Sequence, residues 1–279
     1  MEPALKYSVL MSVYFKEKAE FLQAALDSIW KQTVQTDNFV LVCDGPLTKE
    51  LDDVIEDEEK LHSELTVIRL KKNGGLGNAL NVGMKHCRHE LIARMDSDDI
   101  SRPDRCEKQL AVFRDRPETA VVSGIVEEFS NTIEDVEARR VLPEESEDIL
   151  SFAKKRNPFN HPCVMYRKSA VEAAGGYQDF YLLEDYYLWI RMLQNGCKGY
   201  NLQEPLLWMR AGSEMYKRRA GWKYAGSQRK LFRYMRNTGF IGNGQYLKSI
   251  MIRSGSSMVP NGIRKRMFKT FLRKKGSLS

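Results

Sequence analysis

The sequence predicts an α/β fold in which a mainly parallel sheet is flanked by helices. Over residues 7–95, short apolar runs of strand length alternate with longer stretches of helical periodicity. The strands are continuous apolar runs rather than period-two patterns, which is typical of parallel strands buried on both faces. The chain has 279 residues, of which 42% are hydrophobic and 29% charged, and this is enough for one sizeable domain with an appendage.

The N-terminal half shows this alternation element by element. Strands are expected at residues 7–13, 39–43, 65–70 and 91–95, and helices at residues 18–31, about 48–62 and 76–87. In residues 18–31 the apolar side chains recur at the spacing of an amphipathic helix. Ala79 and Gly83 are four residues apart and predict close packing of their helix on the sheet.

The pattern is less regular after Pro103. A helix ending near residue 117 and a strand at 120–126 precede an acidic stretch at 127–148, which interrupts the alternation; a strand at 163–167 and helices ending at Gly175-Gly176 and Gly196 follow. From Arg210 onward the chain holds 18 lysines and arginines and one acidic residue, against 26 and 36 in residues 1–209. The net charge of +7 therefore belongs to the C-terminal segment, which we expect to form a basic helical extension.

The composition argues against membrane-spanning and secreted proteins. No apolar run approaches the roughly 18 residues of a spanning helix, and Glu2 and Lys6 precede the first short hydrophobic stretch. The five cysteines are scattered and lack C-x-x-C or metal-ligand spacing. We therefore expect reduced thiols and a cytoplasmic location.

Polar residues follow each of the first four predicted strands. They are Tyr14-Phe15-Lys16-Glu17, Asp44-Gly45, Asn73-Gly74-Gly75 and Asp96-Ser97-Asp98-Asp99. In an open parallel sheet the ligand lies beyond the carboxyl ends of the strands, where loops and helix N-termini converge. The sequence therefore predicts a site at this edge.

Asp96 and Asp98 are the candidate metal ligands. They flank one residue at the end of an apolar strand, so both carboxylates can face the crevice. Such oxygen ligands suit Mg²⁺ or Mn²⁺ together with substrate phosphates. The alternative is that Asp98-Asp99 caps the following helix. The position at a sheet edge rich in polar residues favours the metal site.

The other candidates are less specific. Asp44 can accept a hydrogen bond from a uracil ring, although Asp-Gly pairs also mark ordinary turns. The loop at Asn73 lacks the lysine of a phosphate-binding P-loop. Asp185 begins a helix after Glu184, either as a cap or as a base directed into the site, and His161 is either a substrate contact or a structural loop histidine.

Together these residues resemble the family-2 inverting glycosyltransferases with the GT-A fold. The matching segments are residues 8–17, Asp44-Gly45, 73–81, 96–99 and Glu184-Asp185, in the family's order over about residues 5–210. More narrowly, His161-Pro162, residues 182–192 and the Arg210, Arg218-Arg219 run resemble bacterial transferases that build exopolysaccharides such as amylovoran, capsules and O-antigens.

The resemblance implies a catalytic domain at 1–210, with a nucleotide-sugar half at about 1–103 and an acceptor half at about 104–210, before a basic segment at 211–279. It implies the following roles: Asp44, Asp96 and Asn73 on the donor; Asp98 with Asp96 on Mn²⁺ or Mg²⁺; Arg210, Arg218 or Arg219 on the diphosphate; Asp185 as general base; His161 and Glu184 toward the acceptor. The donor would be a UDP-sugar, with galactose or glucose as the hexose, and the acceptor a saccharide on polyprenyl diphosphate.

The basic C-terminal segment has two interpretations. Aromatic and aliphatic residues are interleaved with lysine and arginine, and residues 264–275 are typical of an interfacial amphipathic helix. Docking to the anionic inner face of the cell membrane would bring the enzyme to a lipid-linked acceptor. The alternative is a helix packed on the catalytic domain with a solvated charged face. The near absence of acidic residues favours the membrane.

Two other functions stay open at this point. A sugar-1-phosphate nucleotidyltransferase uses a similar sheet, but it would carry a glycine-rich loop with arginine where this chain has Tyr14-Phe15-Lys16-Glu17. A nucleic-acid-binding protein is suggested by the basic segment alone, without a zinc-finger or helix-turn-helix signature. We expect no nucleic-acid partner, and the oligomeric state cannot be read from the sequence.

Overall fold

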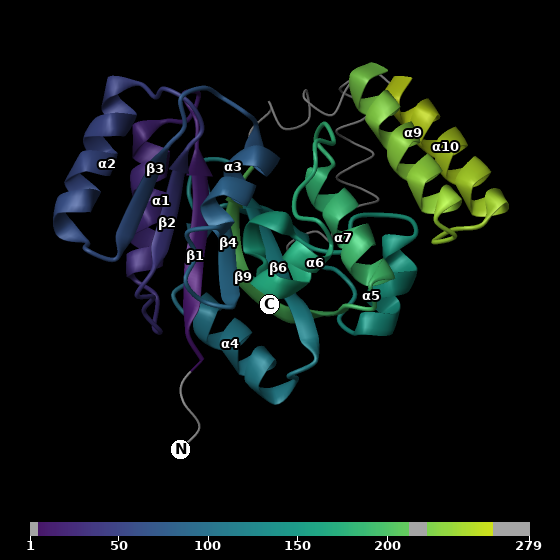
Figure 1. Ribbon diagram of the computed structural model, residues 1–279, viewed down its shortest axis with the longest axis horizontal. Helices are drawn as coiled ribbons and strands as arrows, with labels where there is room; N and C mark the ends of the chain where they lie inside the picture. The colour runs from purple at the N-terminus through teal and green to yellow at the C-terminus, as the bar shows by residue number, and fades with distance from the viewer. Residues whose placement is uncertain (1–4, 212–221, 259–279) are drawn as a thin grey trace.

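A single mixed sheet forms the centre of the molecule, and helices cover both of its faces (Figure 1). The computed structural model describes residues 5–211 and 222–258. The strands are β1 (Tyr7–Val13), β2 (Phe39–Cys43), β3 (Leu65–Arg69), β4 (Leu91–Asp96), β5 (Ile100–Ser101), β6 (Thr119–Phe129), β7 (Val136–Arg140), β8 (Met165–Arg167) and β9 (Lys198–Arg210). They lie in the order β3-β2-β1-β4-β8-β6-β9-β5, with β7 beside β6.

The first four strands of this order are parallel, as predicted. β1 pairs in parallel with β2 and β4, and β2 with β3. The register places Val13 opposite Cys43 and Ser12 opposite Asp96, so β1, β2 and β4 end at one edge. β8 runs antiparallel between β4 and β6, and β6 and β9 are again parallel. The predicted α/β class with a mainly parallel sheet is confirmed.

Two apolar layers bury the faces of the sheet. On one face lie α1 (Ala19–Trp30), α2 (Lys49–Leu61) and α4 (Arg105–Asp115); on the other lie α3 (Leu76–Met84), α5 (Ser146–Ala153), α6 (Lys168–Ala173), α7 (Glu184–Gln194) and α9 (Trp222–Asn237). Successive residues of β1 explain the continuous apolar runs, because Val9 packs into the first layer and Leu10 into the second. α10 (Asn243–Met258) lies beside α9 (Figure 1).

The predicted close approach at Gly83 is confirmed. A Cβ atom on Gly83 would lie 2.4 Å from Leu10 Cδ1 and 2.8 Å from Val42 Cγ2. Only glycine therefore lets α3 come this near to β1 and β2, and this contact fixes the start of α3 at the carboxyl edge of the sheet.

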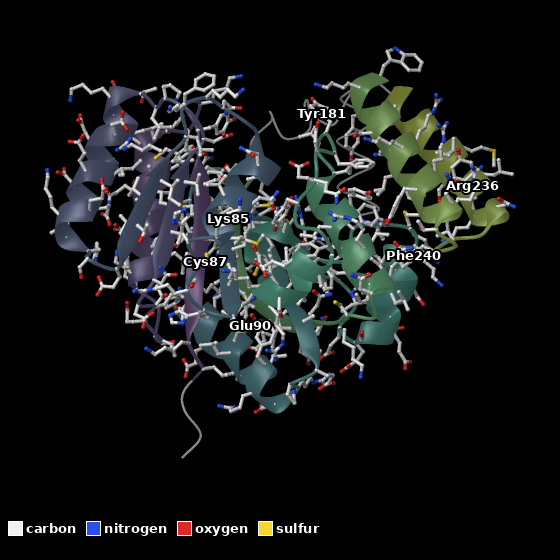
Figure 2. All side chains as sticks on the ribbon, viewed as in Figure 1. Lys85, Cys87, Glu90, Tyr181, Arg236 and Phe240 are labelled. Atoms are coloured by element: carbon white, nitrogen blue, oxygen red, sulfur yellow. The ribbon has the colours of Figure 1, made fainter. Side chains whose placement is uncertain are left out.

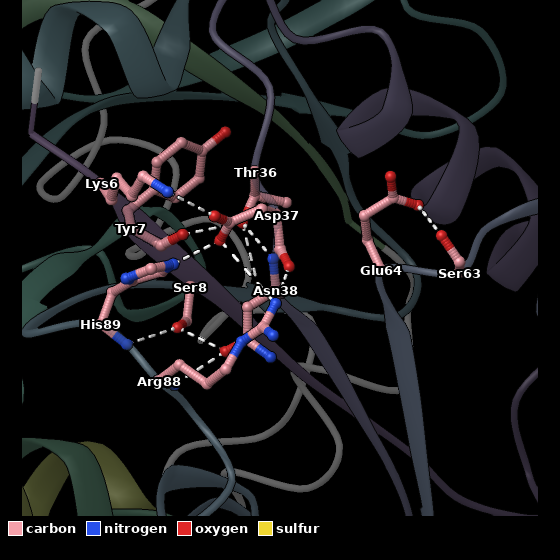
Figure 3. A network of polar contacts seen from close by, with 10 residues as sticks. All are labelled: Lys6, Tyr7, Ser8, Thr36, Asp37, Asn38, Ser63, Glu64, Arg88 and His89. Carbon is pink, nitrogen blue, oxygen red and sulfur yellow. Dashed lines mark hydrogen bonds and ion pairs between the residues drawn. The ribbon is translucent and has the colours of Figure 1, made fainter.

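Structural hydrogen bonds join the strands at the opposite edge (Figure 3). Asn38 Oδ1 accepts from Ser8 Oγ at 2.6 Å and from the Arg88 backbone N–H at 2.8 Å, while Asp37 pairs with Lys6 and His89. These contacts tie the amino ends of β1 and β2 to the segment before β4. They leave the carboxyl edge as the place where a ligand can be held.

The sequence reading missed β9 and shortened β6. Pro205 lies within β9, where the register with β6 is irregular. The strand was not predicted because a proline inside an apolar run argues against a strand. The stretch read as an acidic interruption contains the end of β6 and all of β7. Its first two acids are paired, since Glu127 binds Arg102 and Arg139, and Glu128 binds Arg140 at 2.5 Å.

The basic segment is helical where the structure describes it. Leu231, Phe232 and Met235 of α9 are buried in the same apolar layer as Trp189 of α7. This part therefore packs on the sheet domain. No helix in residues 5–211 or 222–258 has the length and apolarity needed to cross a bilayer. The expected amphipathic helix at 264–275 lies outside the described residues, and the domain boundary at 210 stays a prediction.

Candidate active site

Three aspartates gather at the end of β4. Carboxylate oxygens of Asp96, Asp98 and Asp99 lie within 4.8 Å of one another. Asp99 is buried, and its Oδ1 accepts the Arg210 backbone N–H at 2.9 Å, while Oδ2 has no partner among the described residues. Burial and the charges of Asp98 and Asp96 hold the pKa of Asp99 well above its usual range. A cluster of acidic oxygens with one unpartnered atom fits a divalent cation.

The capping alternative for Asp98-Asp99 is not what the structure shows. α4 begins at Arg105, and its N-cap residue is Asp104, whose side chain makes no capping hydrogen bond. Ser97 points away from the cluster, because its Oγ donates to Glu17 Oε2 at 3.1 Å in the loop after β1. The aspartates therefore precede the start of α4 and do not cap it.

Arg94 contacts the cluster through Asp96 and was not predicted from the sequence. Its side chain is 1% exposed and forms an ion pair with Asp96. Two of its nitrogens, Nε and Nη1, have no partner among the described residues. Arg94 precedes Asp96 by two positions on β4 and so shares its face of the strand. An arginine inside an apolar strand was the signal that could have identified it.

Arg210 lies beside Asp98 and Asp99. Its Nε donates to the Asp98 carbonyl at 3.2 Å, and its guanidinium lies 3.8 Å from the Phe21 ring centroid. Arg218 and Arg219 lie outside the described residues. Of the three arginines predicted to contact the diphosphate, Arg210 alone lies within the described residues, and its contact stays a prediction.

Asp44 and Asn73 form a second polar group at the same edge. The Asp44 carboxylate is buried and accepts the backbone N–H groups of Gly74 at 2.7 Å and Gly75 at 2.9 Å. Asn73 Nδ2 donates to the Asp44 carbonyl at 3.1 Å. Gly45 has φ +91°, and a Cβ there would lie 2.6 Å from Asn73 N. Asp44 thus shapes the loop that leads into α3.

Glu184 and Asp185 begin α7 within the site. Asp185 Oδ2 accepts from Asn157 Nδ2 at 2.6 Å, and Oδ1 from the Tyr186 backbone N–H at 2.7 Å. These two bonds orient the carboxylate. Burial, and then the charge of Asp185, raise the pKa of Glu184 to about 7. Glu184 Oε2 is buried without a hydrogen-bond partner in the described part of the chain.

His161 is buried beside Tyr177 rather than exposed. Its ring is buried, and Nε2 lies 2.9 Å from the Tyr177 hydroxyl. Burial and the nearby Arg94 charge hold the pKa of His161 well below its usual range, so the ring is neutral. This is the geometry of the structural alternative, and an acceptor contact by His161 stays a prediction.

Tyr177 is the residue around which the separate groups meet. The charges of Arg94, Asp185 and Asp96 all act on the pKa of its hydroxyl, which burial raises. A Cβ on Gly77, in the first turn of α3, would lie 3.3 Å from Tyr177 Cβ and 3.8 Å from Glu184 Cβ. Asp96, the first turn of α3 and the start of α7 therefore lie near Tyr177.

The family described as glycosyl transferase family 2 matches residues 8–175. The chain belongs to this family. The match favours the glycosyltransferase interpretation over the nucleotidyltransferase and nucleic-acid-binding ones. It also confirms the resemblance to the family-2 glycosyltransferases.

Two relatives cover nearly the whole glycosyltransferase. The amylovoran biosynthesis glycosyltransferase AmsE of Erwinia amylovora is 41% identical over 257 residues, which is 91% of this chain and 94% of that protein. A UDP-Gal:alpha-D-GlcNAc-diphosphoundecaprenol beta-1,3-galactosyltransferase of Escherichia coli is 38% identical over 269 residues, covering 96% and 97%.

The fold agrees with solved glycosyltransferases. S. aureus TarS 1-349, crystallised in complex with UDP-GlcNAc, superposes with a TM-score of 0.66 at 19% identity, covering 96% of this chain and 77% of that one. The predicted GT-A fold is thereby confirmed, while this level of identity carries the fold alone.

Proposed function

We propose that this glycosyltransferase moves a hexose, galactose or glucose, from a UDP-sugar to a saccharide on polyprenyl diphosphate, with inversion at the anomeric carbon. The observation that carries the proposal is the acidic cluster of Asp96, Asp98 and Asp99 at the end of β4, together with Tyr177, which lies beside the first turn of α3 near Glu184 and feels the charges of Asp96 and Asp185. The acceptor class is supported by the Escherichia coli relative, whose name gives a GlcNAc-diphosphoundecaprenol as the acceptor of galactose.

The donor would lie along the carboxyl edge of the sheet. Asp96 and Asp98 would hold Mn²⁺ or Mg²⁺, and when bound this ion supplies positive charge that offsets the developing charge on the departing diphosphate. Arg210, with Arg218 or Arg219, would contact the same diphosphate. Asp44 and Asn73 would contact the uracil side of the donor, and Asp96 its ribose side.

Asp185 would act as the general base. Its carboxylate takes the proton from an acceptor hydroxyl as that oxygen forms a bond with the anomeric carbon. The bond from the anomeric carbon to the diphosphate oxygen breaks on the opposite face, and UDP leaves with the electron pair. The bonds from Asn157 and Tyr186 keep the Asp185 carboxylate in one orientation. Glu184 and His161 would line the acceptor side.

We further propose that the enzyme works at the cytoplasmic face of the cell membrane as a peripheral protein. A diphospholipid acceptor is held in a membrane, and the chain from Arg210 onward carries 18 lysines and arginines and one acidic residue. The surface involved would be the basic C-terminal segment.

The test is release of nucleotide diphosphate from a panel of UDP- and GDP-sugars with Mn²⁺ and a lipid-linked acceptor. We expect UDP release by the wild type, and losses of about 10²–10⁴-fold in turnover for Asp185→Asn, the range of positioned acid-base groups. Asp98→Ala should lose a similar amount. Asp57→Asn, on the exposed face of α2, is the matched control. Near-normal turnover in both site variants would contradict the proposal.

A further inference from the structure

A cavity of about 310 Å³ lies where α9 meets the loop that leads into Glu184-Asp185. Its lining comes from that loop and from one face of α9: Asp179, Phe180, Tyr181, Lys223, Gly226, Ser227 and Lys230. Figure 2 shows Tyr181 near the tip of the loop, beside one end of α9. None of these residues belongs to the aspartate cluster at β4.

Two lysines give the cavity its chemistry. Lys223 and Lys230 are two helical turns apart, with the small residues Gly226 and Ser227 between them on the same face. The Lys223 ammonium lies 4.0 Å from the Tyr181 ring centroid, and the Lys230 ammonium 4.7 Å from that of Phe180. Among the described residues, no carboxylate lies within ion-pair distance of either ammonium. The aromatic rings thus hold two cations that keep their hydrogens free for an anion.

The loop is held in place as part of the cavity. Ser227 Oγ donates to the Tyr181 carbonyl at 2.9 Å. The next residue, Leu182, has φ +58° and is the one non-glycine residue with positive φ in the described chain. A bulky residue in this conformation is strained and persists only where its surroundings impose it.

The cavity is close to the proposed base. Tyr181 and Asp185 are four positions apart in the chain, and such a segment spans at most about 14 Å even when extended. A saccharide of one or two rings would bridge an anion in the cavity and a hydroxyl at Asp185. Trp222, which is 73% exposed, begins α9 beside Lys223 and offers an apolar surface next to the cations.

We propose that this cavity binds the diphosphate of the lipid-linked acceptor, with Lys223 and Lys230 on the phosphate oxygens and the prenyl chain leaving past Trp222. The inference rests on the proposed function and assigns the acceptor's anion to a place apart from the donor's diphosphate at Asp98 and Arg210. Asp179 also lines the cavity, and its negative charge opposes the same anion.

The experiment measures binding of farnesyl diphosphate to the full-length protein, with UDP and Mn²⁺ as a second, separate ligand. We expect the Lys223→Ala/Lys230→Ala double variant to bind farnesyl diphosphate at least tenfold more weakly and UDP as the wild type does. Lys248→Ala, an exposed lysine on α10, should change neither. Asp179→Asn should bind farnesyl diphosphate more tightly. An unchanged affinity in the double variant, or an equal loss of UDP binding, would overturn the inference.

Two kinds of vesicle distinguish a polyprenyl diphosphate from an ordinary phospholipid headgroup as the anion in the cavity. Vesicles of phosphatidylcholine with a trace of polyprenyl diphosphate should bind the double variant more weakly than the wild type. Vesicles of phosphatidylcholine and phosphatidylglycerol should bind the two proteins equally. If the double variant bound more weakly only to the vesicles with phosphatidylglycerol, the cavity would be a general site for anionic lipid headgroups, and the assignment would be overturned. UDP release by the wild type from a UDP-sugar with the lipid-linked acceptor tests the proposed function, whereas farnesyl diphosphate binding by the double variant tests the cavity, so that the two failures are distinguishable.

Discussion

At the scale of single residues, Arg94 links the two acidic groups of the site. It forms an ion pair with Asp96 while its charge also acts on Glu184 and Tyr177. A buried arginine with unpaired N–H groups is costly unless acids surround it. The sequence predicted Asp96, Asp98 and Asp185 by their places at strand and helix ends. An arginine inside an apolar strand marked Arg94 as unusual, but the sequence could not show that Arg94 and Tyr177 join these acids, because that depends on how β4, α3 and α7 pack.

The raised pKa of Glu184 predicts a pH dependence of stability. The folded state keeps a proton on Glu184 up to a pKa of about 7, whereas the unfolded chain loses it near the ordinary value of 4.5. The free energy of unfolding should therefore fall as pH rises between these values, and this contribution is fully lost above pH 7. Glu184→Gln cannot ionise, so its stability relative to the wild type should increase from pH 5 to pH 8.

Urea unfolding at pH 5, 6, 7 and 8 measures this difference. The relevant neighbours are Asp185, whose charge opposes ionisation of Glu184, and Arg94, whose charge favours it. Glu56→Gln, on the exposed face of α2, provides the control and should show no such trend. If the difference in free energy of unfolding between the wild type and Glu184→Gln stayed constant from pH 5 to pH 8, the pKa of Glu184 would not be raised.

At the scale of elements, the first four strands and the helices between them could be predicted because their patterns are local. The strand bounds 7–13 and 39–43 match the structure, and Thr48 caps α2 with a side-chain hydrogen bond. β9 could not be predicted in the same way. Its residues read KGYNLQEPLLWMR, and a strand with a central proline forms here because the register with β6 shifts beside it.

The contact of α3 with the sheet predicts the effect of Gly83→Ala. The added methyl group would overlap Leu10 and Val42, which lie in well-packed core positions. Overpacking of this kind costs about 1–3 kcal/mol of stability. Because α3 carries the loop of Asn73 and Gly75, UDP binding should weaken as well. Thermal unfolding and UDP affinity are the measurements.

Gly244→Ala is the matched control for Gly83→Ala. Gly244 lies in α10, and a Cβ there meets no heavy atom within 4 Å. Alanine should be neutral or stabilise the helix by up to about 1 kcal/mol. Equal stabilities of the two variants would show that α3 does not pack against Leu10 as closely as the structure indicates.

At the scale of the whole molecule, charge is divided along the chain rather than spread over it. Residues 1–209 hold ten more acidic than basic residues, while the remainder holds 17 more basic than acidic ones. The acidic part contains the site that would bind a metal and a nucleotide, and the basic part packs on it through α9. An anionic surface would therefore attract one side of the protein and repel the other, which orients the enzyme as well as holding it.

This division predicts how the protein binds anionic vesicles. Residues 260–279 carry seven lysines and arginines and no acidic residue, and each basic residue near such a surface contributes about 1 kcal/mol. Removing them should lower sedimentation with phosphatidylglycerol vesicles, and replacing the seven by glutamine at constant length should do the same. Raising the salt from about 0.1 M to about 1 M shortens the screening length from about 10 Å to about 3 Å and should release the wild type. Neutral vesicles are the control, and binding that persists in the glutamine variant at low salt would show that the charge of this segment does not hold the enzyme at the membrane.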